Sequence, residues 1–188
     1  MIKVEFILAS SSPRRIELLK KAGLKFRIIP ADIVENNNSN DPIEVAIKNS
    51  YFKALKVAKK FKNNFVAGFD TVVEIDGKII GKPKNREEAE IMLKTLSGKV
   101  HTVTTGFTIL NLNKMVEIKK YCVSRVKFKN LLQDEIDWYL STDEPYDKAG
   151  AYAIQGIGAF MVKEIYGSFT NVIGLPLCEF IEVLRELK

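Results

Sequence analysis

This sequence of 188 residues has few of the residue types that metal cages, disulfide frameworks and membrane spans require. Its single histidine, His101, excludes a cage of histidine ligands, and we expect it to be structural because it lies in a strand-like run. The two cysteines, Cys122 and Cys178, lack metal-ligand spacing, so we expect reduced, buried thiols and a cytoplasmic location. No apolar run approaches the roughly 20 residues of a membrane helix, so no membrane partner is expected.

The composition is that of a globular protein, with 46% hydrophobic and 28% charged residues. The length fits one domain over residues 1–188, which could form two lobes. The formal net charge of +6 permits nucleic acid, anionic membrane or phosphorylated ligands as partners. Because the basic residues are spread along the chain, the charge alone does not select among these partners.

The apolar pattern predicts alternating strands and helices. We expect strands at residues 4–8, 26–29, 65–69, 71–75 and 78–80, and a long antiparallel hairpin at residues 101–110 and 115–128. Helical spacing and capping residues predict helices between Ser12 and Gly23, then at residues 42–58, 86–96, 133–140 and 176–187. A polar loop is expected at residues 36–40. This order favours an α/β or α+β class with a mixed sheet.

Two segments place charged groups beside apolar strands. Residues 10–15 read SSSPRR, so a strand leads to a helix N-terminus with two arginines, which favours an anion there. A capped helix with solvated arginines explains the same residues equally well. Asp70 lies between apolar runs, and a buried carboxylate requires a partner, a hydrogen bond or a metal. It could hold Mg²⁺ or act as a base toward water, or be a structural aspartate in a turn.

Two further segments are weaker signals. Lys82, between Gly81 and Pro83, could contact phosphate, although taken alone it is better explained as an exposed turn lysine. Gln155 lies in the small-residue stretch at residues 147–158 and is a candidate reader of a planar polar edge; alone, the stretch indicates only a flexible loop. Together, cations, a carboxylate and an amide are the groups that a nucleotide phosphohydrolase uses.

Several motifs in this order resemble the Maf family of nucleotide pyrophosphatases. They are LASSSPRR at residues 8–15, DTVV at 70–73, GKP at 81–83, LSG at 96–98, DKAGAYAIQG at 147–156 and NVIGLPL at 171–177. The resemblance implies an α/β fold with a mixed β-sheet flanked by helices and a deep nucleotide-binding cleft, usually in a homodimer. It implies hydrolysis between the α- and β-phosphates, and the KAGAYAIQG form is similar to the branch acting on dTTP and UTP.

The resemblance also implies roles for individual residues. Asp70 matches the family's proton acceptor, and the positions linked to substrate choice are Arg14, Thr71 and Gln155. Further cleft positions are Ser10, Arg15, Glu35, Lys53 and Lys82. Phe69 departs from the alanine that the family commonly has there, which puts the shape of the pocket in doubt.

We therefore hypothesise that Mg²⁺ or Mn²⁺ bridges Asp70 and Glu35 to the phosphate oxygens, and that Asp70 activates the attacking water. The expected partner is a nucleoside triphosphate substrate, with no nucleic acid. Two alternatives stay open: a nucleic-acid-binding module, which the charge would suit, and a non-enzymatic regulator of septum formation, the process after which family members are named.

Overall fold

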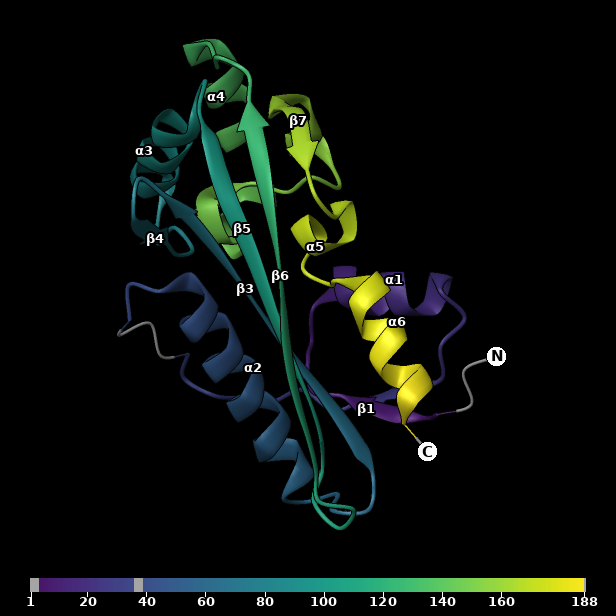
Figure 1. The fold of residues 1–188 in the computed structure, drawn as a ribbon. Coiled ribbons are helices and arrows are strands. Elements are labelled where there is room, and N and C mark those ends of the chain that lie inside the picture. Colours follow the sequence, from purple (N-terminus) through teal and green to yellow (C-terminus); the bar gives the residue numbers. More distant parts are fainter. Residues whose placement is uncertain (1–3, 36–38, 188) are drawn as a thin grey trace. The chain divides into compact units, whose positions relative to one another are not determined.

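The structure is a computed structural model that describes residues 4–35 and 39–187. In that part of the chain a mixed sheet has the order β2-β1-β3-β5-β6-β7, with β4 hydrogen-bonded to β3 off this path (Figure 1). β1 pairs in parallel with β2 and β3, whereas β4 pairs antiparallel with β3 and β7 antiparallel with β6. The strands are β1 (Phe6–Leu8), β2 (Phe26–Ile28), β3 (Phe65–Ile75), β4 (Lys78–Ile80), β5 (Val100–Asn111), β6 (Val116–Phe128) and β7 (Val162–Tyr166).

Helices connect most of these strands. They are α1 (Pro13–Lys21), α2 (Pro42–Ala58), α3 (Arg86–Leu96), α4 (Gln133–Leu140), α5 (Phe169–Ile173) and α6 (Leu177–Glu186). Three short 3₁₀ helices are η1 (Glu144–Asp147), η2 (Ala149–Ala151) and η3 (Ile157–Met161). None of the helices in the described part of the chain is both long and apolar enough to cross a bilayer.

Local sequence signals explain where several elements begin and turn. The Asp41 carboxylate accepts a hydrogen bond from the Ile43 N–H at the start of α2, and the Asn85 side chain accepts one from the Glu88 N–H at the start of α3. Asp76 and Gly77 both have positive φ, at 52° and 75°, as a tight two-residue hairpin turn requires. The predicted helices at residues 42–58 and 86–96, the predicted strand at residues 78–80 and the mixed α/β class are confirmed.

Two predictions need correction. Residues 65–69 and 71–75 are one continuous strand, β3, because a polar side chain at Asp70 does not interrupt backbone pairing. The cysteines are not both buried: Cys178 is exposed and Cys122 half-buried, although both are free. Cys178 lies on the side of α6 away from its buried residues. β7 and α5 were not predicted, and of the expected loop at residues 36–40, residues 36–38 lie outside the described residues.

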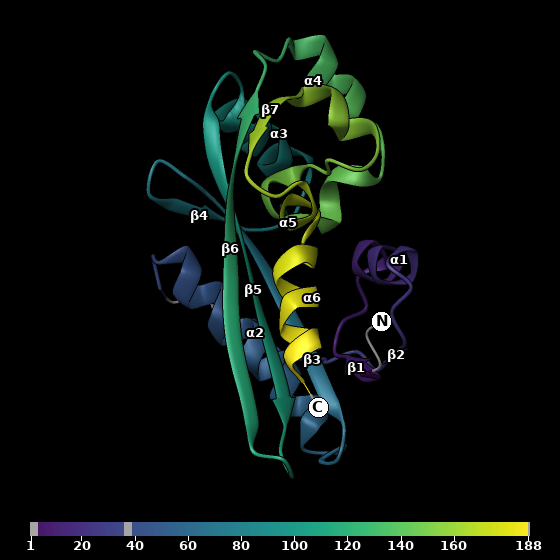
Figure 2. The ribbon, with the colours of Figure 1, turned by 45° about the vertical axis from the view of Figure 1, so that its right-hand side comes forward.

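The chain divides into two compact units. The first comprises the described residues up to Thr71, Thr105–Cys122 and the chain from Gly174 onward; the second comprises Val72–Thr104 and Val123–Ile173. In the first unit, α2 and α6 lie on opposite faces of β3 and β5 (Figure 2). Val66 packs with α2, whereas Phe65, Ala67 and Phe69 pack with Phe180 of α6, so successive residues of β3 serve the two faces in turn.

In the second unit, α3 and α4 cover the strands with a separate apolar cluster. His101 is buried in this unit, and its Nε2 lies 2.7 Å from the Tyr152 hydroxyl. Its ring makes edge-to-face contacts with Phe128 and Tyr152. These surroundings favour the neutral imidazole, and burial lowers the pKa of His101 to about 4.

We predict that His101 makes the protein less stable in acid. An imidazole in the unfolded chain has a pKa of about 6.5, so below that pH the unfolded chain binds a proton that the native protein does not. The free energy of unfolding should fall by about 3 kcal/mol as the pH decreases from about 6.5 to about 4. Urea unfolding at a series of pH values, with His101→Gln as the reference, measures this contribution. Equal pH dependence in the two proteins would show that His101 is not responsible.

Candidate active site

A carboxylate inside the sheet is the centre of the candidate site. Asp70 lies in the middle of β3 and is only 5% exposed. Placing an ionised carboxylate there is unfavourable unless charge and hydrogen bonds compensate. Burial raises the pKa of Asp70 above its ordinary value, as does the charge of Glu35, whereas Lys53 opposes the rise.

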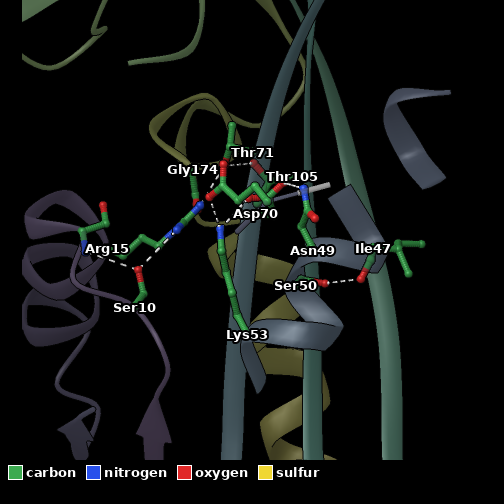
Figure 3. Close-up of polar contacts among 12 residues, drawn as sticks. Ser10, Arg15, Ile47, Asn49, Ser50, Lys53, Asp70, Thr71, Thr105 and Gly174 are labelled. Atoms are coloured by element: carbon green, nitrogen blue, oxygen red, sulfur yellow. Dashed lines mark hydrogen bonds and ion pairs between the residues drawn. The ribbon is translucent and has the colours of Figure 1, made fainter. Parts of the chain in front are cut away.

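Two side chains of α2 provide that compensation. Lys53 Nζ lies 2.6 Å from Asp70 Oδ1, and the Asn49 side-chain amide donates to Asp70 Oδ2 at 3.2 Å. Asn49 and Lys53 are four residues apart, so they project from the same side of the helix (Figure 3). Each carboxylate oxygen of Asp70 therefore has its own donor, and the orientation of the carboxylate is fixed.

Two glycines allow α2 to come close enough for these contacts. A Cβ added at Gly68 of β3 would lie 2.2 Å from the Ser50 carbonyl oxygen, and one at Gly106 of β5 would lie 2.6 Å from the Ala46 carbonyl carbon. Real Cβ atoms do not approach backbone this closely. The helix therefore lies directly on the backbone of both strands, at Ser50, which follows Asn49, and at Ala46, three residues before Asn49.

Lys53 also joins a second carboxylate to the site. Its ammonium lies 2.6 Å from Glu35 Oε1, the same distance as from Asp70. The Lys53 side chain is only 12% exposed, whereas that of Glu35 is 38% exposed. The two carboxylates thus converge on one point, with Asp70 on the buried side and Glu35 on the solvent side.

A buried arginine forms the other half of the site. Arg15 Nε donates to the Gly174 carbonyl at 2.7 Å, Nη2 to Thr71 Oγ1 at 2.9 Å and Nη1 to Ser10 Oγ at 3.3 Å (Figure 3). Its guanidinium carbon lies 5.7 Å from the centroid of the Phe69 ring. Burial lowers the pKa of Arg15 to about 10, which leaves it positively charged at neutral pH.

Phe69 therefore does not lie on the Asp70 side of the strand. Its ring is fully buried against Phe107 and Phe180, on the face of β3 opposite α2. The face of the Phe69 ring contacts the Arg15 guanidinium. Along β3 the side chain of Asp70 points to one face, whereas those of its neighbours Phe69 and Thr71 point to the other. One strand therefore orients both the carboxylate and the partners of Arg15.

Of the nine residues that the sequence suggested, six belong to these two connected groups in the first unit. They are Ser10, Arg15, Glu35, Lys53, Asp70 and Thr71. Arg14 lies half-buried in the first turn of α1. Lys82, which is exposed, and Gln155, which is half-buried, belong to the second unit.

Sequence reasoning missed three contributors. Asn49 is fully buried against Asp70, Thr105 Oγ1 lies 3.0 Å from Thr71 Oγ1, and the Gly174 carbonyl accepts from Arg15. For Asn49 a signal existed, because a polar residue four positions before Lys53 lies on the same helical face. Thr105 and Gly174 are distant in sequence, and nothing local connects them to the site.

The site combines two basic side chains, Lys53 and Arg15, with two carboxyl groups, Glu35 and Asp70. Such a site holds a basic oxygen, Asp70, beside cations that attract an anionic substrate. It is therefore suited to removing a proton from water next to a phosphate group.

Comparison with known proteins gives consistent findings. A model of the Maf-like protein family matches residues 5–187. A dTTP/UTP pyrophosphatase of Fusobacterium nucleatum is 49% identical over 181 residues, which cover 96% of this chain and 94% of that protein. A protein of the same name from Syntrophus aciditrophicus is 47% identical over 188 residues, covering 100% and 92%. Among solved structures, the Ham1 protein of Staphylococcus aureus has a TM-score of 0.52 at 15% identity, covering 97% and 98%, which shows a likeness of fold.

We predict that Gly68→Ala destabilises the protein because its methyl group would displace α2 from β3. The expected loss is about 2 kcal/mol in the free energy of unfolding, a typical cost of overpacking. Gly81→Ala is the matched control, since no atom lies within 4 Å of its added Cβ. Chemical denaturation measures both variants, and equal stabilities would contradict the close approach of helix and strand.

Proposed function

This chain belongs to the Maf-like protein family, and we propose that it hydrolyses dTTP and UTP to the nucleoside monophosphate and pyrophosphate. The observation that carries the proposal is the buried carboxylate of Asp70, held by Lys53 and Asn49 beside the charge of Arg15. The names of the two relatives, at 49% and 47% identity, support the substrate and the reaction.

Asp70 is the proposed proton acceptor. Burial raises its pKa, which makes it a stronger base, and the charge of Lys53 opposes that rise. As Asp70 takes a proton from water, the water oxygen bonds to the α-phosphorus. The bond from that phosphorus to the oxygen bridging the β-phosphate breaks, and this oxygen leaves with the electron pair as part of pyrophosphate. The proton on Asp70 then passes to solvent.

The cations are proposed to neutralise the triphosphate and the departing pyrophosphate. In the first unit, Lys53 and Arg14 are the proposed phosphate ligands. Lys82 is also proposed to contact phosphate, because it matches a cleft position of the family. Each nitrogen of Arg15 already donates to a protein acceptor, so Arg15 contributes its charge from a fixed position. Ser10 and Thr71 are held in place by the same contacts.

The donor set is compatible with a divalent cation. The described residues contain no group of three or more His, Cys, Asp or Glu side chains that could form a cage. Glu35 and Asp70 nevertheless both contact the Lys53 ammonium, so they approach the same region of the site, and Mg²⁺ commonly takes one or two carboxylates together with substrate phosphates. We propose that these two carboxylates hold Mg²⁺ or Mn²⁺, which when bound would neutralise charge on the phosphate oxygens.

Gln155 is the proposed reader of the base. Thymine and uracil present an N–H beside a carbonyl oxygen, and a carboxamide offers the complementary acceptor and donor. We further propose a homodimer, on the strength of the family resemblance alone. A single catalytic domain is proposed from the chain length, and a cytoplasmic location from the free cysteines. Light scattering of the purified protein tests the dimer.

We predict that Asp70→Asn lowers kcat with dTTP by about 10³-fold, because the amide cannot accept a proton from water. Pyrophosphate and orthophosphate release, assayed separately with Mg²⁺ or Mn²⁺, measures the effect. For the unmodified protein, kcat/KM should rise with pH through a pKa above the ordinary aspartate range, since only the ionised carboxylate is a base.

Asp76→Asn is the control for that experiment, because Asp76 is a largely exposed acid at the end of the same strand. It should keep full turnover. Near-normal turnover in Asp70→Asn, with unchanged unfolding, would exclude Asp70 as the base.

We predict that Gln155→Glu lowers kcat/KM for dTTP and UTP by at least about tenfold, because a carboxylate cannot donate to the base carbonyl. Turnover of dCTP, whose edge has the opposite pattern, should fall less. The ratio of kcat/KM for dTTP to that for dCTP is the measurement. An unchanged ratio would place base recognition elsewhere.

A further inference from the structure

The proposed role of Gln155 requires a fixed orientation of its carboxamide. A carboxamide reads a base edge only if it is presented in one direction, because rotation exchanges its donor and acceptor. Within the described part of the second unit, no residue forms a hydrogen bond with the Gln155 carboxamide. Its direction must therefore be set by the backbone on either side of it.

One carboxylate of the same unit holds that backbone. Glu144, the first residue of η1, accepts hydrogen bonds from the Ile157 N–H at 3.0 Å and from the Gly158 N–H at 2.8 Å. It also accepts one from the Tyr139 hydroxyl at 3.0 Å. These two N–H groups belong to the first turn of η3, which begins two residues after Gln155. An ionised carboxylate forms stronger bonds to such donors than a neutral acceptor does.

The backbone between Gln155 and η3 lies against the Glu144 carboxylate. Gly156 has φ +136°, which favours glycine, and a Cβ added there would lie 2.2 Å from Glu144 Oε2. A Cβ added at Gly158 would lie 2.7 Å from the Ala153 carbonyl oxygen and 2.9 Å from the Tyr139 hydroxyl. The stretch from Ala153 to Gly158 therefore folds tightly around these two side chains.

From these contacts we infer that Glu144 is a positioning residue for base selection, which orients Gln155 by fixing the backbone that follows it. This inference rests on the proposed role of Gln155. Glutamate suits the position because both of its oxygens accept, and all three of its neighbours donate. Glutamine would place an NH₂ group against an N–H donor, so one of the contacts would be lost.

The test is steady-state kinetics of the full-length protein with dTTP and dCTP. In Glu144→Gln, KM for dTTP should rise about tenfold and kcat should stay within about threefold, because Asp70 and its partners are untouched. The dTTP-to-dCTP ratio of kcat/KM should fall about tenfold. Hydrogen exchange of the Ile157 and Gly158 amides should be faster in the free variant.

Two further variants complete the experiment. Asp143→Asn removes the same charge from the preceding, exposed residue and should leave KM, the nucleotide ratio and the exchange unchanged. Tyr139→Phe keeps the buried ring but removes one donor to Glu144, so it should shift KM and the ratio in the same direction by less. If Glu144→Gln does not fold, the same measurements on Tyr139→Phe test the inference.

The outcomes separate this inference from the proposed function. If the unmodified protein turns over dTTP but Glu144→Gln and Tyr139→Phe keep its KM and nucleotide ratio, Glu144 does not orient the reader. A fall of kcat alone, equal for both nucleotides, would contradict it as well. Absence of turnover in the unmodified protein would instead overturn the proposed function itself.

Discussion

The ion pair between Asp70 and Lys53 is the interaction on which the rest of the first unit depends. A carboxylate in the middle of a buried strand is several kcal/mol unfavourable without compensation. Its compensation comes from Lys53 and Asn49, which are four residues apart on α2 and approach only because Gly68 and Gly106 leave the strand surface bare. The contacts that compensate the buried Asp70 carboxylate therefore depend on the position of α2, and that position depends on the two glycines.

Arg15 is the second buried charge that joins separate parts of the first unit. Arg15 connects the turn after β1, through Ser10, with β3, through Thr71, and with the segment before α6, through the Gly174 carbonyl. Replacing these buried charges with apolar groups would often stabilise a protein. The presence of buried charges in this unit therefore favours a chemical role over a role in stability. Lys53, which pairs with both Asp70 and Glu35, is the cation that can turn to an anionic substrate, whereas Arg15 stays fixed by its protein acceptors.

The sequence predicted this arrangement unevenly. The capping residues Asp41 and Asn85 and the turn at Asp76 act locally, so most helices and hairpins could be placed from the sequence. Chemistry and resemblance identify Asp70 and Lys53 from the sequence. The predicted division of the strand at Asp70 is wrong, because a polar side chain does not interrupt backbone pairing. Gly174 and Thr105 could not be found, since only the tertiary fold brings them to Arg15 and Thr71. Nor could the sequence tell which face of β3 Phe69 occupies.

The position of the attack on the triphosphate is the most direct test of the account. Hydrolysis of dTTP in water enriched in oxygen-18, with products analysed by mass spectrometry, shows which phosphorus receives the water oxygen. If Asp70 activates water for attack at the α-phosphorus, the label appears in dTMP and the pyrophosphate stays unlabelled. Label in pyrophosphate, or release of orthophosphate as the first product, would contradict the account.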